Sequence, residues 1–371
     1  MPNKIGVFCP TLNIYGGGEY VAIAIANTLA ENNRHVILFS SNKINPQDIK
    51  KYFGETLHPN IETLQQPTPF TPRGLIDFYQ TIIHSYIAKS KCTAFIDAFS
   101  NCVFPWTEVT YIHYPYLNNH TFNKTFPYLN HPRLSQAATL PQVILEKNLV
   151  NYKKHLVLAN SHYTAKEIQK YSSKTAEVLY PPFPSTITNK NTTPTKKNQT
   201  NLVVTVSRLD GNKQLERIPQ IAAQTNPNIH FAIIGRLYNQ TTLNQLQNLT
   251  KKLDLTSRVH FYPNAPAEQK IELLKKAKIY LHTMIAEHFG ISIVEAMAVG
   301  CLPIVHDSGG MREFVPAQYR YQTIAEAATK INNEINNWTN QKAEEVRALT
   351  EKFSFTSFST QFMELYTKHY N

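Results

Sequence analysis

Two glutamates stand at a spacing that could place both on one bound molecule. The stretch Glu287-His-Phe-Gly-Ile-Ser-Ile-Val-Glu295 separates them by seven residues, and a helix is predicted from Gly290 to Val299. Glu287 should then lie on the loop before the helix and Glu295 within its first turns, so that the two carboxylates contact opposite ends of one extended ligand. Glu295 falls in an apolar run, where an unpaired charge would be costly. That cost argues against a surface glutamate.

Two cations follow a predicted strand in the same half of the chain. Arg208 and Lys213 bracket the loop between the strand Leu202–Val206 and a helix predicted to begin near Leu215. A planar guanidinium fork and a lysine ammonium at the start of a helix are groups that can clamp a diphosphate. A solvated basic loop is the alternative, and these two residues alone do not decide between them.

A glycine turn is the corresponding candidate in the first half. Gly16, Gly17 and Gly18 connect a short apolar strand to a helix predicted from Glu19. Glycine lets the backbone adopt positive φ and approach a ligand closely, and the free amides of a helix start suit an anion. The spacing is not Gly-X-Gly-X-X-Gly and no acidic residue ends the second strand, which disfavours a nicotinamide dinucleotide. A tight turn without a ligand is the alternative.

A histidine is the remaining candidate for chemistry. His113 comes just after the predicted strand Val109–Ile112. Ligands of open α/β sheets bind outside the carboxyl ends of the strands, so this imidazole is expected at the ligand-binding edge. A structural histidine is the commoner fate of any one of the 14 histidines. Position alone distinguishes His113 from the others.

Strands and helices alternate in both halves of the chain, and this alternation predicts an α/β fold. We expect two Rossmann-like, doubly wound domains facing across a cleft. Residues 1–184 form the first domain and 201–352 the second, and the polar stretch 185–200 is the predicted linker. A final helix in 353–371 is expected to pack back on the first domain.

Composition narrows the class of partner. The chain has 371 residues, 42% of them hydrophobic and 17% charged, which indicates a globular protein, and no run is long and apolar enough to cross a bilayer. The net charge of +11 implies an attraction to something negative. No recognition helix, zinc finger or RNA-binding signature accompanies that charge, so nucleic acid is disfavoured relative to an anionic membrane surface or a phosphorylated substrate.

Together these residues resemble the large GT-B-type family 4 of retaining glycosyltransferases. The family's glutamate pair is matched by Glu287 and Glu295, its basic pair by Arg208 and Lys213, and its early glycine loop by residues 16–18, in the same order along essentially the whole chain. A finer likeness is to the dolichol-linked oligosaccharide α-1,2-mannosyltransferases. That likeness is carried by Gly-Gly-Gly-Glu19, Tyr111-Ile-His-Tyr-Pro115, Asn160-Ser161, Leu179-Tyr-Pro-Pro182, Glu287-His-Phe-Gly-Ile291 and Ser308-Gly-Gly310.

The sequence also departs from that branch. No N-terminal membrane anchor is recognised, and Met311-Arg-Glu-Phe314 after the second glycine turn is closer to the wider family. The reaction implied is transfer of a hexose, with mannose from GDP-mannose as the first choice of donor and a lipid-linked or glycan acceptor. A UDP-sugar donor with a different acceptor is the alternative, and a non-catalytic basic protein that associates with membranes or nucleic acid is a remote one.

The resemblance implies a division of roles. Arg208 and Lys213 would neutralise the donor diphosphate, Glu295 would contact the nucleotide ribose, and Glu287 and His113 would act on the transferred sugar as the catalytic residues. The implied donor-binding set is Gly16, Gly17, Gly18, Arg208, Lys213, Glu287, Phe289, Gly290, Ile291 and Glu295. The nucleotide-sugar is then a co-substrate, and neither a metal nor another cofactor is expected.

Two segments are candidates for acceptor and membrane contact. Residues 70–87 and 114–128 are rich in aromatic side chains and contain Arg73, His84, His120 and Lys124. Aromatic and basic side chains together suit an anionic interface, although ordinary packing is an equally simple reading. The expected location is cytoplasmic, peripheral on the inner face of a membrane.

Overall fold

The structure is a computed structural model that describes residues 4–66, 75–115, 132–151, 154–172, 175–188 and 201–370. The predicted linker from residue 189 onward lies outside these ranges, as do Arg73, His120 and Lys124. The chain divides into two compact units: unit 1 comprises Met1–Pro46, Thr56–Pro181 and Phe358–Asn371, and unit 2 comprises Gln47–Glu55 and Pro182–Ser357.

Unit 1 is built on a parallel sheet in the order β3-β2-β1-β4-β5-β6-β7. Its strands are β1 (Lys4–Phe8), β2 (His35–Ser40), β3 (Ile61–Gln65), β4 (Ala94–Asp97), β5 (Val109–Ile112), β6 (Leu156–Ala159) and β7 (Glu177–Val178). The inner strands are near-continuous apolar runs because helices cover both faces of a parallel sheet. Val7, Phe39 and Ile96 are fully buried as a result.

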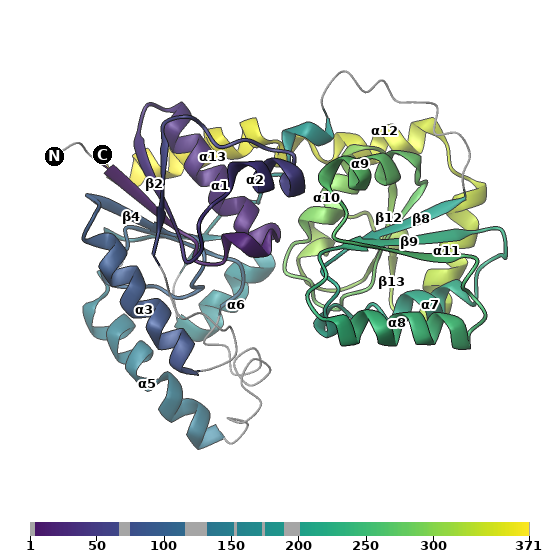
Figure 1. Ribbon diagram of the computed structural model, residues 1–371, viewed down its shortest axis with the longest axis horizontal. Helices are drawn as coiled ribbons and strands as arrows, with labels where there is room; N and C mark the ends of the chain where they lie inside the picture. Colours follow the sequence, from purple (N-terminus) through teal and green to yellow (C-terminus); the bar gives the residue numbers. More distant parts are fainter. Residues whose placement is uncertain are drawn as a thin grey trace. The chain divides into compact units, whose positions relative to one another are not determined.

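The helices of unit 1 form a layer on each side of its sheet, as Figure 1 shows. On one side lie α1 (Gly17–Glu31) and α13 (Phe355–Tyr370), and on the other α3 (Leu75–Lys89), α5 (Pro132–Leu149) and α6 (His162–Ser172). From Phe358 onward α13 belongs to unit 1, although the residues before it belong to unit 2. No helix among the described residues has the length and apolar character that crossing a bilayer would require.

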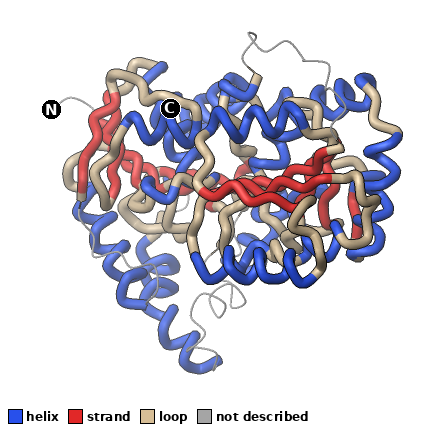
Figure 2. Tube along the Cα trace, turned by 45° about the vertical axis from the view of Figure 1, so that its right-hand side comes forward, coloured by secondary structure: helices blue, strands red, loops and turns tan. Residues whose placement is uncertain are grey.

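Unit 2 repeats the design with a parallel sheet in the order β10-β9-β8-β11-β12-β13. Its strands are β8 (Leu202–Val206), β9 (His230–Gly235), β10 (Val259–Pro263), β11 (Ile279–His282), β12 (Leu302–His306) and β13 (Arg320–Tyr321). Its helices are α2 (Pro46–Phe53), α7 (Arg217–Ala222), α8 (Gln240–Lys252), α9 (Ala267–Lys276), α10 (Ile291–Ala298), α11 (Ile324–Asn336) and α12 (Asn340–Ala348). Figure 2 shows the strands as an inner layer with helices above and below.

In both sheets the strand order reverses at one point. The reversal falls between β1 and β4 in unit 1 and between β8 and β11 in unit 2. In open α/β sheets the ligand binds outside the carboxyl ends of the strands at such a point. The segments that follow β1, β8 and β11 carry residues 16–18, Arg208, Lys213 and Glu287, so the topology accounts for the placement of these candidate residues. The predicted pair of doubly wound α/β domains is confirmed.

One segment near the N-terminus belongs to the second unit, which the division expected from the sequence did not anticipate. Residues 47–55 cluster with unit 2. The hydroxyl of Ser185 donates to Glu55 at 2.9 Å, and the guanidinium of Arg236 lies 4.2 Å from the centre of the Tyr52 ring. These contacts join residues more than a hundred positions apart, which sequence periodicity does not reveal.

Candidate functional site

The Glu287 carboxylate is held by two basic side chains in the loop between β11 and α10. Its Oε2 accepts a hydrogen bond from the Lys213 ammonium at 2.9 Å and lies 3.2 Å from Nε2 of His282. Glu287 is only 9% exposed. Burial alone would raise the pKa of Glu287, but the charges of Lys213 and His282 outweigh it and hold that pKa well below its usual range. Glu287 is therefore a fixed anion at neutral pH.

The second glycine turn holds the backbone of this loop. The hydroxyl of Ser308 accepts from the backbone N–H of Ala286 at 2.7 Å, and the N–H of Gly310 donates to the carbonyl of Glu287 at 2.8 Å. Gly309 has a φ of +68°, and a Cβ there would lie 2.3 Å from the Glu287 carbonyl oxygen. Only glycine fits this contact without displacing the loop. The turn after β12 therefore fixes the backbone that carries Glu287.

The residues between the two glutamates have structural roles of their own. Gly290 has a φ of +94° and caps α10, which begins at Ile291. The ring of Phe289 is 2% exposed and packs against Phe314 and Phe353, with centroids 5.1 and 5.3 Å away. The Phe289 side chain therefore anchors the loop in the core, and only backbone groups of this residue remain for a ligand.

Glu295 lies on α10 with its charge compensated. It is 6% exposed, and its two carboxylate oxygens accept from the Lys270 ammonium at 2.8 and 3.0 Å. An unpaired charge in this apolar run would be costly, and Lys270 on α9 is the partner that compensates it. Glu295 is buried as expected, but its burial is explained by the ion pair without any ligand.

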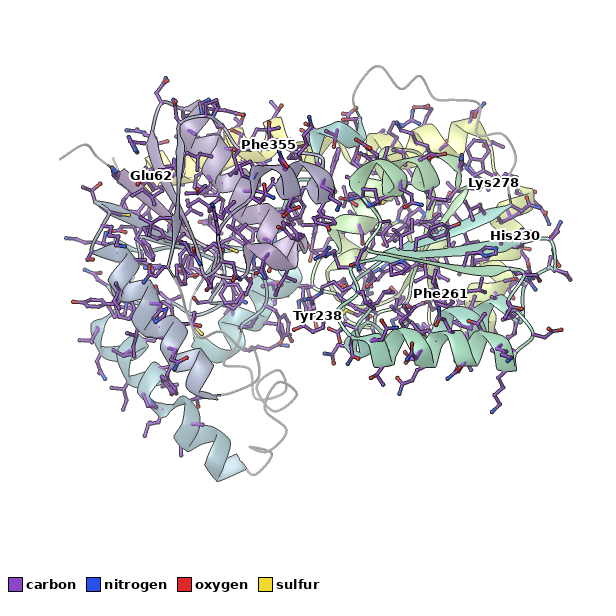
Figure 3. All side chains as sticks on the ribbon, in the orientation of Figure 1. Glu62, His230, Tyr238, Phe261, Lys278 and Phe355 are labelled. Carbon is purple, nitrogen blue, oxygen red and sulfur yellow. The ribbon has the colours of Figure 1, made fainter. Side chains whose placement is uncertain are left out.

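The two cations of the expected clamp have different partners. Lys213 ends a short 3-10 helix, Gly211–Lys213, whose first turn is capped by Asp210, and its ammonium points to Glu287. The guanidinium of Arg208 lies 5.6 Å from the centre of the Tyr238 ring, which is 44% exposed on the loop after β9 (Figure 3). No described carboxylate forms an ion pair with Arg208. Arg208 keeps its charge available, whereas Lys213 is already neutralised.

The first glycine turn differs from the expectation in one respect. Gly17 and Gly18 lie within α1, which begins at Gly17, and Gly16 is its N-cap with a φ of −95°. The expected positive φ at residues 16–18 is therefore wrong. What requires glycine is proximity: a Cβ on Gly18 would lie 3.3 Å from Nε2 of His113, and one on Gly16 would lie 2.7 Å from the Glu19 carboxylate. The turn brings the start of α1 against the histidine.

His113 is fixed on three sides at the end of β5. Its backbone N–H donates to Asn101 at 2.7 Å, and its carbonyl accepts from the Asn160 side chain at 2.9 Å. Nε2 lies 3.1 Å from the carbonyl of Ala98, so this nitrogen carries the hydrogen and Nδ1 is left as an acceptor. Burial lowers the pKa of His113, which keeps the ring neutral.

Asp97 organises the turn that receives His113. It ends β4, is fully buried, and its Oδ1 accepts from the backbone N–H groups of Phe99 and Ser100 at 2.9 and 2.8 Å. Burial raises the pKa of Asp97 to about 6 against an ordinary value of 3.8. The folded turn, and with it the Ala98 carbonyl beneath His113, depends on a carboxyl that folding makes harder to ionise.

The structure thus assembles two sets of candidate residues, one in each unit. Within unit 2, Lys213 and Glu287 meet directly; within unit 1, the glycine turn meets His113. Sequence reasoning missed His282 and Lys270. His282 ends β11 and Lys270 lies in α9, so a position at the carboxyl end of a strand was the signal available for His282. Among the described residues no group of His, Cys, Asp or Glu gathers as a metal site would require, and independence of metal stays a prediction.

The pattern of the glycosyl transferases group 1 family matches residues 187–353. A protein of Dictyostelium discoideum named GDP-Man:Man(3)GlcNAc(2)-PP-Dol alpha-1,2-mannosyltransferase is 32% identical over 160 residues, which cover 40% of this chain and 31% of that protein. A Xenopus laevis protein of the same name is 24% identical over 89% of this chain and 78% of its own length. The stretch matched in the Dictyostelium relative is therefore less than a third of that protein.

Solved structures share the architecture over nearly the whole chain. Anabaena HepE, determined with UDP and glucose, superposes with a TM-score of 0.70 at 20% identity and covers 98% of this chain and 99% of its own. WaaG, a glycosyltransferase involved in lipopolysaccharide biosynthesis, gives a TM-score of 0.74 at 16% identity, with 96% and 97% covered. Residues 187–353 therefore match the glycosyl transferases group 1 family, and the chain as a whole has the GT-B fold.

Proposed function

We propose that this protein is a retaining hexosyltransferase that moves mannose from GDP-mannose to a lipid-linked oligosaccharide. The observation that carries the proposal is the buried Glu287 carboxylate held by Lys213 within the group 1 domain. Relatives named as GDP-mannose-dependent α-1,2-mannosyltransferases of dolichol-linked glycans favour mannose and a lipid-linked acceptor.

Within unit 2 each charged group has a distinct task. Arg208, free of a described ion pair, binds the donor diphosphate and takes up the charge of the leaving group. The Lys213 ammonium binds the same diphosphate as well as Glu287. The Glu287 carboxylate then accepts hydrogen bonds from hydroxyls of the donor sugar. Glu295 accepts from the ribose while Lys270 keeps its charge balanced. The contribution of His113 from unit 1 stays part of the prediction.

The proposed transfer step needs no acid or base other than the two substrates themselves. The acceptor hydroxyl oxygen forms a bond to the anomeric carbon on the face from which the diphosphate departs, and the bond from that carbon to the phosphate oxygen breaks. Because the new bond forms on the face that the diphosphate leaves, the configuration of the anomeric carbon is retained. The hydroxyl proton passes to the departing phosphate oxygen. The products are the extended glycan and the nucleoside diphosphate.

Transfer is tested with radiolabelled GDP-mannose and a synthetic lipid diphosphate carrying the trimannosyl chitobiose core. Product is extracted into organic solvent and treated with a linkage-specific α-1,2-mannosidase. We expect label in the lipid fraction, release by the mannosidase, and loss of transfer in Glu287→Gln. Full transfer by Glu287→Gln would contradict the site, and no transfer from GDP-mannose would contradict the substrate.

The donor base is tested by binding instead of turnover. A ligand that binds only the folded state raises the melting temperature in proportion to the logarithm of its concentration over Kd. We expect GDP to raise the melting temperature more than UDP or ADP at equal concentration. A larger shift with UDP would replace the GDP-mannose assignment with a UDP-sugar enzyme and leave the reaction class standing.

An anionic membrane surface is the proposed platform for the lipid-linked acceptor. Helices α3 and α5 of unit 1 lie side by side in Figure 1, and the Tyr79 hydroxyl on α3 donates to the carbonyl of Ala138 on α5. These two helices carry a set of large apolar side chains between 45% and 62% exposed: Ile83, Tyr86, Ile87, Leu140, Ile144 and Leu149. An apolar face on a protein with a net charge of +11 suits the boundary between headgroups and acyl chains.

Flotation with vesicles containing phosphatidylserine tests this surface. We expect binding at low salt and its reduction in Ile83→Glu with Ile144→Glu, because both changes put a carboxylate in the apolar face. The control is Ile285→Glu, an exposed isoleucine (40%) in unit 2. Equal flotation of all three proteins, or none by the wild type, would remove this platform from the proposal.

A further inference from the structure

Unit 2 contains a pocket of about 320 Å³ that none of the assigned donor residues lines. It lies between the turn after β12, which forms the 3-10 helix Gly309–Glu313, and the segment that follows α12. Its lining residues are Arg312, Glu313, Phe314, Val315, Pro316, Arg320, Leu349 and Lys352. The volume is at the small end of the range for ligand pockets.

Positive charge dominates this lining. Three of the lining side chains are cationic and one is acidic. Oδ1 of Asp307 accepts a hydrogen bond from the Arg320 guanidinium at 3.0 Å and forms an ion pair with Nε of Arg312 at 3.2 Å. One carboxylate therefore orients two guanidiniums without neutralising both, and Lys352 adds a third charge.

Arg320 shows an unmet requirement for an acceptor. Its side chain is 18% exposed, and its Nε–H is buried with no hydrogen-bond partner among the described residues. A buried donor without a partner costs about 1–3 kcal/mol, and an acceptor that reached this Nε–H would remove that cost. A planar guanidinium fork matches the oxygens of a phosphate.

We propose that this pocket binds a small phosphorylated molecule through its phosphate group. The phosphate would contact Arg312, Arg320 and Lys352, and the rest of the molecule would lie against the apolar side, where Leu349 is 40% exposed. The available volume admits a molecule about the size of a triose or hexose phosphate. This site is separate from the diphosphate clamp, which is assigned to Arg208 and Lys213.

The pocket shares a structural element with the donor site. Arg312 and Glu313 belong to the same 3-10 helix as Gly310, whose N–H donates to the Glu287 carbonyl at 2.8 Å. Anion binding at Arg312 therefore acts on the turn that positions Glu287. If the proposed transferase activity holds, an anion bound in the pocket should change the KM of the enzyme for the donor.

Binding is measured by isothermal titration with inorganic phosphate and with glycerol 3-phosphate. The test variant is Arg312→Gln with Lys352→Gln, the charge-matched control is Lys251→Gln with Lys252→Gln at the end of α8, and Lys213→Gln reports on the donor clamp. Losing a charge-assisted hydrogen bond weakens binding by roughly tenfold or more. We expect that loss in the pocket variant and unchanged binding in the other two, with glycerol 3-phosphate binding more tightly than phosphate.

Several outcomes would overturn the inference. Loss of phosphate binding in Lys213→Gln alone would assign the anion to the donor clamp, and equal weak binding in all variants would indicate an adventitious ion only. Binding to phosphatidic acid vesicles without binding to glycerol 3-phosphate would replace the small molecule by a lipid headgroup. Because titration needs no turnover, these results stand even if transfer from GDP-mannose is not observed.

Discussion

Replacing Lys213 by methionine should destabilise unit 2 measurably, because the change strands a buried carboxylate. Glu287 would keep Nε2 of His282, 3.2 Å from its Oε2, and the backbone N–H of His288, 3.2 Å from its Oε1. Breaking a fully buried ion pair costs about 3–5 kcal/mol. The Lys213 and Glu287 side chains retain 19% and 12% exposure, so we expect a cost just below that range, about 2–3 kcal/mol. For a domain of this size that corresponds to a fall in Tm of about 4–12 °C.

The same reasoning predicts a rescue. Adding Glu287→Gln to Lys213→Met removes the stranded charge, so the melting temperature should return most of the way while transfer stays lost. Thermal melts followed by circular dichroism at pH 7.5 give the stability, and the radiolabel assay gives the activity. The control is Lys276→Met, which breaks an ion pair whose partners are 56% and 63% exposed and should shift the melting temperature by no more than about 2 °C. A Lys213→Met protein that melts with the wild type, or a double variant no more stable than it, would refute the buried-pair argument.

Three further predictions concern pH, the second glycine turn and metal. Folding raises the pKa of Asp97 to about 6 from 3.8, so the folded state holds the proton more tightly and the free energy of unfolding should fall by roughly 2 kcal/mol between pH 4 and 6. Asp97→Asn should abolish that fall in urea titrations, and parallel profiles for the two proteins would contradict it. Gly309→Ala should lower kcat at least about tenfold by displacing Glu287, because φ is +68° at this position. The control is Gly211→Ala, where a Cβ meets Thr242 at an ordinary 3.9 Å and activity should be retained. Equal kcat values for the two variants would contradict the role of the second glycine turn. EDTA should leave transfer unchanged, and a strict requirement for a divalent cation would contradict the basic clamp.

Local patterns in the sequence were enough to predict the fold. Alternating apolar strands and amphipathic helices predict two parallel sheets, and β5 and β8 begin and end where the pattern places them. Short-range rules of this kind work because a strand in a parallel sheet is apolar on both faces wherever it occurs. The same rules place Glu287 on a loop and Glu295 within a helix, as found.

What the sequence could not determine is which side chains meet. Lys213 and Glu287 are 74 positions apart, and Lys270 and Glu295 are 25 apart. Their pairing follows from the order of strands in the sheet, which no local propensity encodes. The glycines at 16–18 were identified from the sequence, but only the packed structure reveals His113 against Gly18. Residue types and spacing thus determined the chemistry available to this protein, whereas the tertiary structure decided which charges compensate each other, since an ion pair depends on distance in space.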